Sequence, residues 1–351
     1  MAGTIHGRYT LKVNYLLLIA HNIGIMRSNL FIVYFGSVFT WVAAVTDKTF
    51  AESSYETGPV RRVQQTRPDY IPHDNRRKLD HNGYTSADSI PDEFDAREYF
   101  TKCTRVLSQV RDQGNCASSW AVSVASAFTD RLCIATDGQF TKKLSAQHIM
   151  SCGDDKQAGC QGGSAYRAWE FTKNHGVVTG GNFNSKEGCQ PYRRRYCDHA
   201  GDLSMKNCST LGPMRPTICQ RKCFNSQYNV DYESDLHKTS EVYMTSWTNT
   251  TQIQQEIMTY GPVTAAMYVY ENFMNYKTGV YKDTTGELIG YHHVKLIGWG
   301  VEQDQDGSTE YWLAMNSWNS GWGDRGLFKI LRGYNFCSIE LLVMAGMVER
   351  R

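Results

Sequence analysis

Three separated strings of the chain carry side chains that could together perform nucleophilic catalysis. Residues 112–121 read DQGNCASSWA and place a hydroxyl, Ser119, at the start of a helical pattern. His292 supplies an imidazole far downstream, and Asn316 supplies an amide 24 residues after it. A nucleophile, a base that takes its proton and a group that orients the base are the parts such a site requires. A lone histidine is more often structural, but this order of strings, with Gln113 upstream, favours a functional site.

These strings resemble the active-site segments of papain-family cysteine peptidases. The family's nucleophile segment reads Gln-Gly-x-Cys-Gly-Ser-Cys-Trp-Ala, and its second cysteine is the catalytic one; here that position is Ser119. By the same resemblance, His292 is the catalytic histidine and Asn316 the amide that orients it. Gln113 takes the place of the oxyanion-hole glutamine, which would act with the backbone N–H of residue 119. The chain therefore resembles a peptidase whose catalytic thiol is missing.

Further strings narrow the resemblance to the cathepsin B-like branch, over residues 90–348. They are residues 94–97, 130–134 and 188–192, with an insertion at 197–208 that resembles the occluding loop of that branch. The resemblance implies an α+β, papain-like fold of two lobes, a helical left lobe and a β-barrel-like right lobe, with the active-site cleft between them. It implies no cofactor and no metal site.

The chain contains eleven cysteines, all from residue 103 onward, which indicates an oxidising compartment. Spacing alone leaves the pairing open. By the family resemblance, Cys337 matches a free cysteine, and we expect it to act as a small buried hydrophobe rather than a substitute nucleophile. The resemblance implies five disulfides: Cys103–Cys133, Cys116–Cys160, Cys152–Cys219, Cys189–Cys223 and Cys197–Cys208.

Several residues match the walls of the family's substrate cleft. Gly162 and Gly163 belong to a Gly-Cys-x-Gly-Gly string, in which the glycines let a peptide backbone approach; a tight turn beside a disulfide explains them equally well. Trp318 keeps the place that flanks the site. His199 remains in the insertion and could pair with Asp112.

Other residues depart from the family's pattern. Tyr291 and His293 replace the small residues on either side of the catalytic histidine, so the cleft is expected to be partly filled. Ala117 stands in place of a glycine, and Ala200 in place of the second histidine of the insertion, which puts carboxydipeptidase action in doubt. Leu342 stands where the branch carries an acid in its main specificity pocket, so a preference for basic side chains should be lost. Residues 47–89 also lack the family's inhibitory string.

The serine changes the chemistry open to the site. A thiol pKa starts at about 8.5 and falls to ~3–4 in papain-type sites, whereas a hydroxyl starts near water's ~15.7. The gap between the lowered thiol pKa and what the same site could give a hydroxyl is roughly 7 pKa units, which corresponds to ~10 kcal/mol. A helix amino terminus stabilises a negative charge by ~2 kcal/mol at best, so no resting serine alkoxide can form here. Attack would need general-base help from His292, and Asn316 adds no charge to stabilise the resulting imidazolium. We expect hydrolysis to be absent or lower by several orders of magnitude.

Local patterns predict the elements that position these residues. Ser118 or Ser119 can cap a helix that continues to Phe128, and Ser145 can cap a second. Because a helical first half is followed by a β-rich second half, the fold class is α+β. Two further helices are predicted at 164–175 and 250–260, and strands at 263–269, 291–298, 311–316, 326–331 and 342–348.

The residues before position 90 are predicted to lie outside the folded peptidase domain. Residues 1–46 are interpreted as an extension plus a signal peptide, with Met26 as a candidate true start. Residues 47–89 read as a short pro-segment or linker, and the peptidase domain as residues 90–351. The apolar stretch is too short for a stable membrane span, since spans need ~20 residues. We expect entry to the secretory pathway and an extracellular or lysosomal destination.

The nearly balanced charge of the chain limits which classes of binding partner the sequence favours. Lys and Arg total 37 against 35 for Asp and Glu, so nothing favours nucleic acid as a partner. The favoured hypothesis is a monomeric pseudoprotease that holds a peptide or protein, or a protein inhibitor, in its cleft. The alternatives are a peptidase of low turnover through Ser119 and His292, an engineered change at residue 119 (which the other departures argue against) and a structural matrix protein.

Overall fold

The computed structural model describes residues 90–153, 159–199, 205–212, 218–245, 248–304 and 307–348. All of them fall within one compact unit of the chain. The predicted signal peptide and pro-segment, and Ala200 in the insertion, lie outside the described residues.

The four predicted helices are confirmed. They are α4 (Ser119–Ala135), α5 (Ala146–Cys152), α6 (Ala165–Asn174) and α7 (Thr250–Tyr260). The Ser145 side chain caps α5, as predicted, and the side chains of Ser164 and Asn249 cap α6 and α7. The short helices are α2 (Ala96–Tyr99), η2 (Thr101–Cys103), α3 (Thr104–Leu107), η3 (Gly159–Gln161), η4 (Cys208–Thr210), α8 (Glu271–Met274) and η5 (Phe336–Ser338).

The predicted side-chain cap of α4 is wrong. Ser118 is the N-cap residue, but its hydroxyl makes no capping hydrogen bond. It lies 2.7 Å from the hydroxyl of Tyr192 instead. A buried tertiary partner thus replaces the local bond that the sequence pattern favours.

The described strands form one sheet in the order β2-β8-β3-β5-β6-β7-β4, with β1 paired to β5. Only the β4–β7 pair is parallel. The strands are β1 (Phe94–Asp95), β2 (Glu241–Met244), β3 (Val263–Tyr270), β4 (Val280–Tyr281), β5 (Leu288–Asp304), β6 (Gly307–Met315), β7 (Leu327–Leu331) and β8 (Val343–Met347).

All five predicted strands occur, and the prediction for β5 was too short. Its register continues along β6 to the pair Asp304–Gly307, through polar residues that show no apolar alternation. The short strands β1, β2 and β4 were not predicted, because two to four residues carry too little periodicity. These strands exist through their pairing with β5, β8 and β7.

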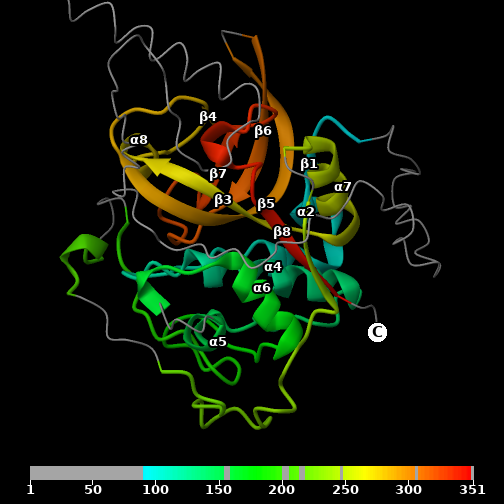
Figure 1. Cartoon of the computed structure of the whole chain (residues 1–351), viewed down its shortest axis with the longest axis vertical. Helices are drawn as coiled ribbons and strands as arrows, with labels where there is room; N and C mark the ends of the chain where they lie inside the picture. Colours follow the sequence, from blue (N-terminus) through cyan, green and yellow to red (C-terminus); the bar gives the residue numbers. More distant parts are fainter. Residues whose placement is uncertain are drawn as a thin grey trace, which may run out of the picture. The chain divides into compact units, whose positions relative to one another are not determined.

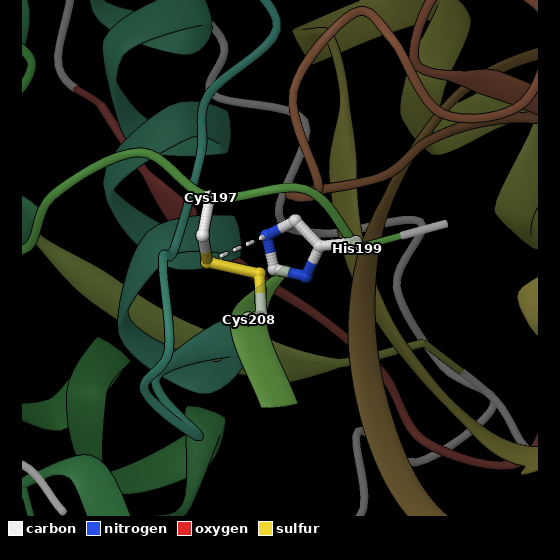
Figure 2. A group of neighbouring side chains, drawn as sticks. All are labelled: Cys197, His199 and Cys208. Atoms are coloured by element: carbon white, nitrogen blue, oxygen red, sulfur yellow. Dashed lines mark hydrogen bonds between the residues drawn. A yellow bond between two sulfur atoms is a disulfide. The ribbon is translucent and has the colours of Figure 1, made fainter. Parts of the chain in front are cut away.

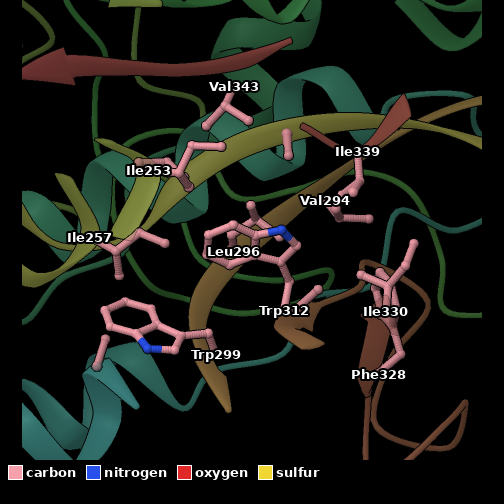
Figure 3. Close-up of a cluster of buried hydrophobic side chains, with 14 of the residues drawn as sticks. Ile253, Ile257, Val294, Leu296, Trp299, Trp312, Phe328, Ile330, Ile339 and Val343 are labelled. Carbon is pink, nitrogen blue, oxygen red and sulfur yellow. The ribbon is translucent and has the colours of Figure 1, made fainter. Parts of the chain in front are cut away.

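Two separate apolar cores account for the two-lobe character. One lies on the sheet and includes Leu296, Trp299 and Trp312 (Figure 3). The other lies among α4, α5 and α6 and includes Trp120 and Trp169. Figure 1 shows these helices together on one side of this unit and the strands on the other. The α+β prediction is confirmed, and α4 packs against β5 where the two parts meet.

The five disulfides named above are all present. Cys337 is free, and burial raises its pKa to about 12, so its thiol stays protonated near neutral pH. None of the helices in the described ranges has the length and apolar character that a membrane crossing requires.

Candidate functional site

Ser119 is the first residue of α4 and is buried where this helix meets β5. Its Oγ accepts a hydrogen bond of 3.2 Å from the backbone N–H of His293. The hydroxyl is thus held by the strand that carries His292. Within the described part of the chain, no hydrogen bond joins the Ser119 hydroxyl to the His292 ring.

His292 and Asn316 form a directed pair. Nε2 of His292 lies 2.8 Å from Oδ1 of Asn316, and both residues are buried. Because Oδ1 only accepts, Nε2 carries the proton of the neutral ring and Nδ1 holds the lone pair. The indole of Trp318 covers the pair, with its centroid 4.8 Å from the imidazole. The fold therefore brings the His292 and Asn316 strings into direct contact, while Ser119 contacts the same strand through the backbone of His293.

Burial sets the charge of this imidazole. It lowers the pKa of His292 to about 4, and the hydrogen bond to Asn316 opposes part of that shift. His292 is consequently neutral near pH 7 and can accept a proton at Nδ1. The neutral amide of Asn316 offers the resulting imidazolium no compensating charge.

Gln113 is held rigidly beside the start of α4. Its Nε2 donates to the carbonyl of Cys116 at 2.8 Å, and its Oε1 accepts from the hydroxyl of Ser317 at 2.6 Å. The Tyr192 hydroxyl donates to the Gln113 backbone carbonyl at 2.8 Å. One hydrogen of the side-chain amide is left for another acceptor, which is what an oxyanion donor needs.

Ser317 and Tyr192 belong to this site, although sequence reasoning gave them no role. Ser317 stands directly after Asn316, and Tyr192 ends the 188–192 string, so both lay inside strings already recognised. Their partners are Gln113 and Ser118, which are distant in sequence. Only the fold reveals that they support the nucleophile segment.

The insertion contacts the site through His199. Its Nε2 lies 2.9 Å from Oδ1 of Asp112, and its ring stacks on Trp318 at 5.7 Å. Asn319 donates to the other oxygen of Asp112 at 3.0 Å. Figure 2 shows His199 beside the Cys197–Cys208 disulfide. Since both sulfur atoms are joined to each other, neither is a thiolate that could bind a metal ion.

The two glycines of the predicted cleft wall differ in their surroundings. A Cβ at Gly163 would lie 2.4 Å from the Trp120 ring, so this glycine is required by packing. A Cβ at Gly162 would meet nothing within 4 Å, and the residue has φ +112°. Only Gly162 has the open surroundings that a bound backbone would use.

The remaining predicted positions lie on the sheet side of residue 119. Tyr291 and His293 are on β5, and the Tyr291 ring packs edge-on to His293 at 5.6 Å. Leu342 is half-buried and packs against the helical core, and no carboxylate occupies its position.

Comparisons with known proteins agree with this geometry. Residues 90–347 match the model of the papain family cysteine proteases. A cathepsin B-like cysteine proteinase of Schistosoma japonicum is 42% identical over 276 residues, 78% of each chain. Cathepsin B-like cysteine proteinase 4 of Caenorhabditis elegans is 42% identical over 261 residues, 74% of this chain and 76% of the relative.

A solved structure points the same way. Procathepsin B S9 from Trypanosoma congolense superposes with a TM-score of 0.60 at 31% identity, over 74% of this chain and 78% of the other. The fold, the order of the site residues and the matched length have one explanation: this chain belongs to the papain family of cysteine proteases, with cathepsin B-like proteinases among its relatives.

Proposed function

We propose that this protein is a secreted, cathepsin B-like pseudoprotease that binds peptides or proteins in its cleft with little or no turnover. The observation that carries the proposal is the hydroxyl at residue 119, at the amino end of α4 beside a neutral His292. Thiolate and imidazolium normally stabilise each other in such a site, and a serine cannot supply the thiolate.

The binding part of the proposal rests on the groups that persist. Gln113, His292 and Asn316 keep a connected geometry, and Gly162 leaves open space. The family acts on peptide bonds, so peptides or proteins, substrate-like or inhibitory, are the class of ligand we propose. The five disulfides support an oxidising destination, extracellular or lysosomal, and we propose a monomer there.

A slow peptidase is the second candidate, and one observation favours it. Nε2 of His292 is engaged by Asn316, and within the described ranges Nδ1 has no hydrogen-bond partner, so it can take a proton as general-base attack by Ser119 would require. The expected rate is low, because Asn316 brings no negative charge to the imidazolium.

The test compares three purified proteins, the natural chain, Ser119→Cys and Ser119→Ala, on a fluorogenic dipeptide substrate. The same preparations are assayed for binding of labelled peptides by fluorescence anisotropy. We expect peptide binding in all three and turnover at least about 1,000-fold higher in Ser119→Cys, as befits a reactive thiolate. Robust turnover by the natural chain that Ser119→Ala abolishes would establish the slow peptidase. Absence of peptide binding in all three would reject the proposal.

A further inference from the structure

A cluster of exposed cationic side chains lies outside the site described above, on two loops that cover residues 186–198 and 220–225. We call it the basic surface, and its members are Lys186, Arg193, Arg195, Arg221 and Lys222. Basic and acidic residues nearly balance over the whole chain, 37 against 35, so this concentration of one sign is uneven. None of the five forms an ion pair with another described residue.

The two loops are fastened to each other. The Cys189–Cys223 disulfide joins them covalently. Beside it, Nε2 of Gln190 donates to the backbone carbonyl of Lys222 at 2.9 Å. The cationic residues of both loops are therefore held as neighbours by the fold, although like charges repel one another.

The Arg193 side chain is ordered as well as exposed. Its guanidinium lies over the Phe224 ring, 3.6 Å from the centroid, and its backbone N–H donates to Oε1 of Gln147 at 3.0 Å. A guanidinium presents several N–H donors in one plane, which matches the two oxygens of a carboxylate. A ring that already holds this plane lowers the entropic cost of binding an acidic group.

The acidic residues of the same two loops do not neutralise this surface. In the described ranges they are Glu187 and Asp198. Glu187 pairs with Nζ of Lys143 at 2.7 Å, and Asp198 is buried. The basic surface therefore keeps a net positive charge, which attracts an anionic partner.

The basic surface adjoins the nucleophile segment, which favours a polypeptide as that partner. A Cβ at Gly114 would lie 2.5 Å from the backbone carbonyl oxygen of Arg195, so the two backbones are packed tightly together. Gly114 directly follows Gln113 of the candidate site. An extended chain spans ~3.3–3.6 Å per residue, so a polypeptide that lies in the cleft reaches the basic surface within a few residues.

We propose that the basic surface binds an acidic segment of the same polypeptide that the cleft holds. The ligand class is then a peptide or protein with several Asp or Glu residues close to the stretch that lies in the cleft. This inference rests on the proposed peptide binding, and adds a second contact surface and the charge of the ligand.

The test uses the full natural chain and fluorescein-labelled dodecapeptides that share one uncharged half. The other half, placed at either end, contains four Glu residues or, in the matched control, four Gln residues. We expect the Glu peptide to bind roughly tenfold tighter in fluorescence anisotropy at low salt, as a few exposed ion pairs would give. At about 0.5 M salt the ratio should fall below about threefold, because surface charges are then screened.

Two variants locate the effect. The double substitution Arg193→Gln with Arg195→Gln should reduce the Glu-to-Gln ratio to less than about threefold and leave the affinity of the Gln peptide unchanged. The control, Arg105→Gln with Arg325→Gln, removes the same charge from exposed arginines outside the basic surface and should keep the ratio. Circular dichroism checks that both variants fold.

The remaining outcomes separate this inference from the proposed function. If Glu and Gln peptides bind the natural chain equally, the inference is overturned while peptide binding stands. It is also overturned if the preference persists without Arg193 and Arg195, or if a heparin tetrasaccharide binds through these arginines and the peptides show no preference. If no peptide binds, the proposed function fails and the inference with it.

Discussion

At the scale of single residues, the site lacks the thiolate–imidazolium charge pair of a cysteine peptidase, whereas the His292 ring is still oriented by Asn316. His292 is oriented by Asn316 at 2.8 Å and covered by Trp318, as a base requires. Its pKa is about 4 because burial disfavours the charged ring, with a smaller lowering effect of His199 and an opposing effect of the hydrogen bond to Asn316. The missing ion pair, rather than a displaced imidazole, explains why we expect so little turnover.

The charge argument predicts a pKa change on Ser119→Cys. In the natural chain, His292 should be neutral above about pH 4 and protonated below it. A thiolate at residue 119 would stabilise the imidazolium, so the His292 midpoint should rise by several units in the variant. Titration of the ring signals by NMR measures this. His148, buried in α5 with a pKa lowered to about 3 by burial, serves as the internal control. An unchanged His292 midpoint would contradict the ion-pair explanation.

At the scale of elements, the two adjacent glycines of the 159–163 segment are required for two different reasons, one of them packing against α4. Gly163 makes room for the Trp120 ring, which belongs to the helical core. Gly162 has no such neighbour and owes its residue type to a positive φ. Because the two glycines are adjacent, local pattern alone assigns them the same role.

The two glycines therefore predict different responses to alanine. Gly163→Ala should lower the melting temperature by roughly 3–10 °C, because overpacking costs ~1–3 kcal/mol in a domain of this size. Gly162→Ala should cost only the strain of a positive φ, about 1 kcal/mol, while weakening peptide binding. Differential scanning fluorimetry and the anisotropy assay measure both. Equal thermal losses in the two variants would show that the Trp120 contact is not the constraint at Gly163.

At the scale of the whole described unit, the helical and sheet cores are joined by a buried ion pair. Nζ of Lys295 on β5 lies 2.5 Å from Oδ2 of Asp130 on α4, and each side chain is 2% exposed. Arg131, next along α4, contacts Glu256 of α7 at 2.9 Å. Burial raises the pKa of Asp130 and lowers the pKa of Lys295, and the mutual attraction of the two groups offsets only part of each shift.

Removal of one charge should cost more than removal of both. Lys295→Met should destabilise the protein by ~3–5 kcal/mol, because a carboxylate is left buried without a partner. The double variant Asp130→Leu with Lys295→Met should recover most of that loss. Urea unfolding of the two single variants and the double variant gives the coupling energy. Additive losses in the double variant would show that the pair does not couple the two cores.

The proposed secretory route predicts one glycan, at Asn249. The chain has two acceptor sequons, Asn207-Cys208-Ser209 and Asn249-Thr250-Thr251. The first has a disulfide-bonded middle residue, whereas Asn249 is exposed and caps α7 through its Oδ1. Protein secreted from eukaryotic cells should lose mass on N-glycosidase treatment. Thr251→Ala should remove that shift and keep the cap, and Thr251→Ser should retain it. An unshifted natural protein would argue against this route.

The sequence by itself determined the family, the α+β class and the four predicted helices, and it supplied the candidate residues of the site. Each of these features can be predicted from a short contiguous segment: helices from serine caps and apolar periodicity, and the family from motifs that contain the candidate site residues. Only the tertiary structure decided that Ser119 accepts from His293, that Ser118 binds Tyr192 rather than capping α4, and that Gly163 serves Trp120. It also decided the length of β5 and the Asp130–Lys295 pair. The hydrogen bonds and the ion pair join residues 74 to 174 positions apart, and local periodicity carries no information about partners at such distances.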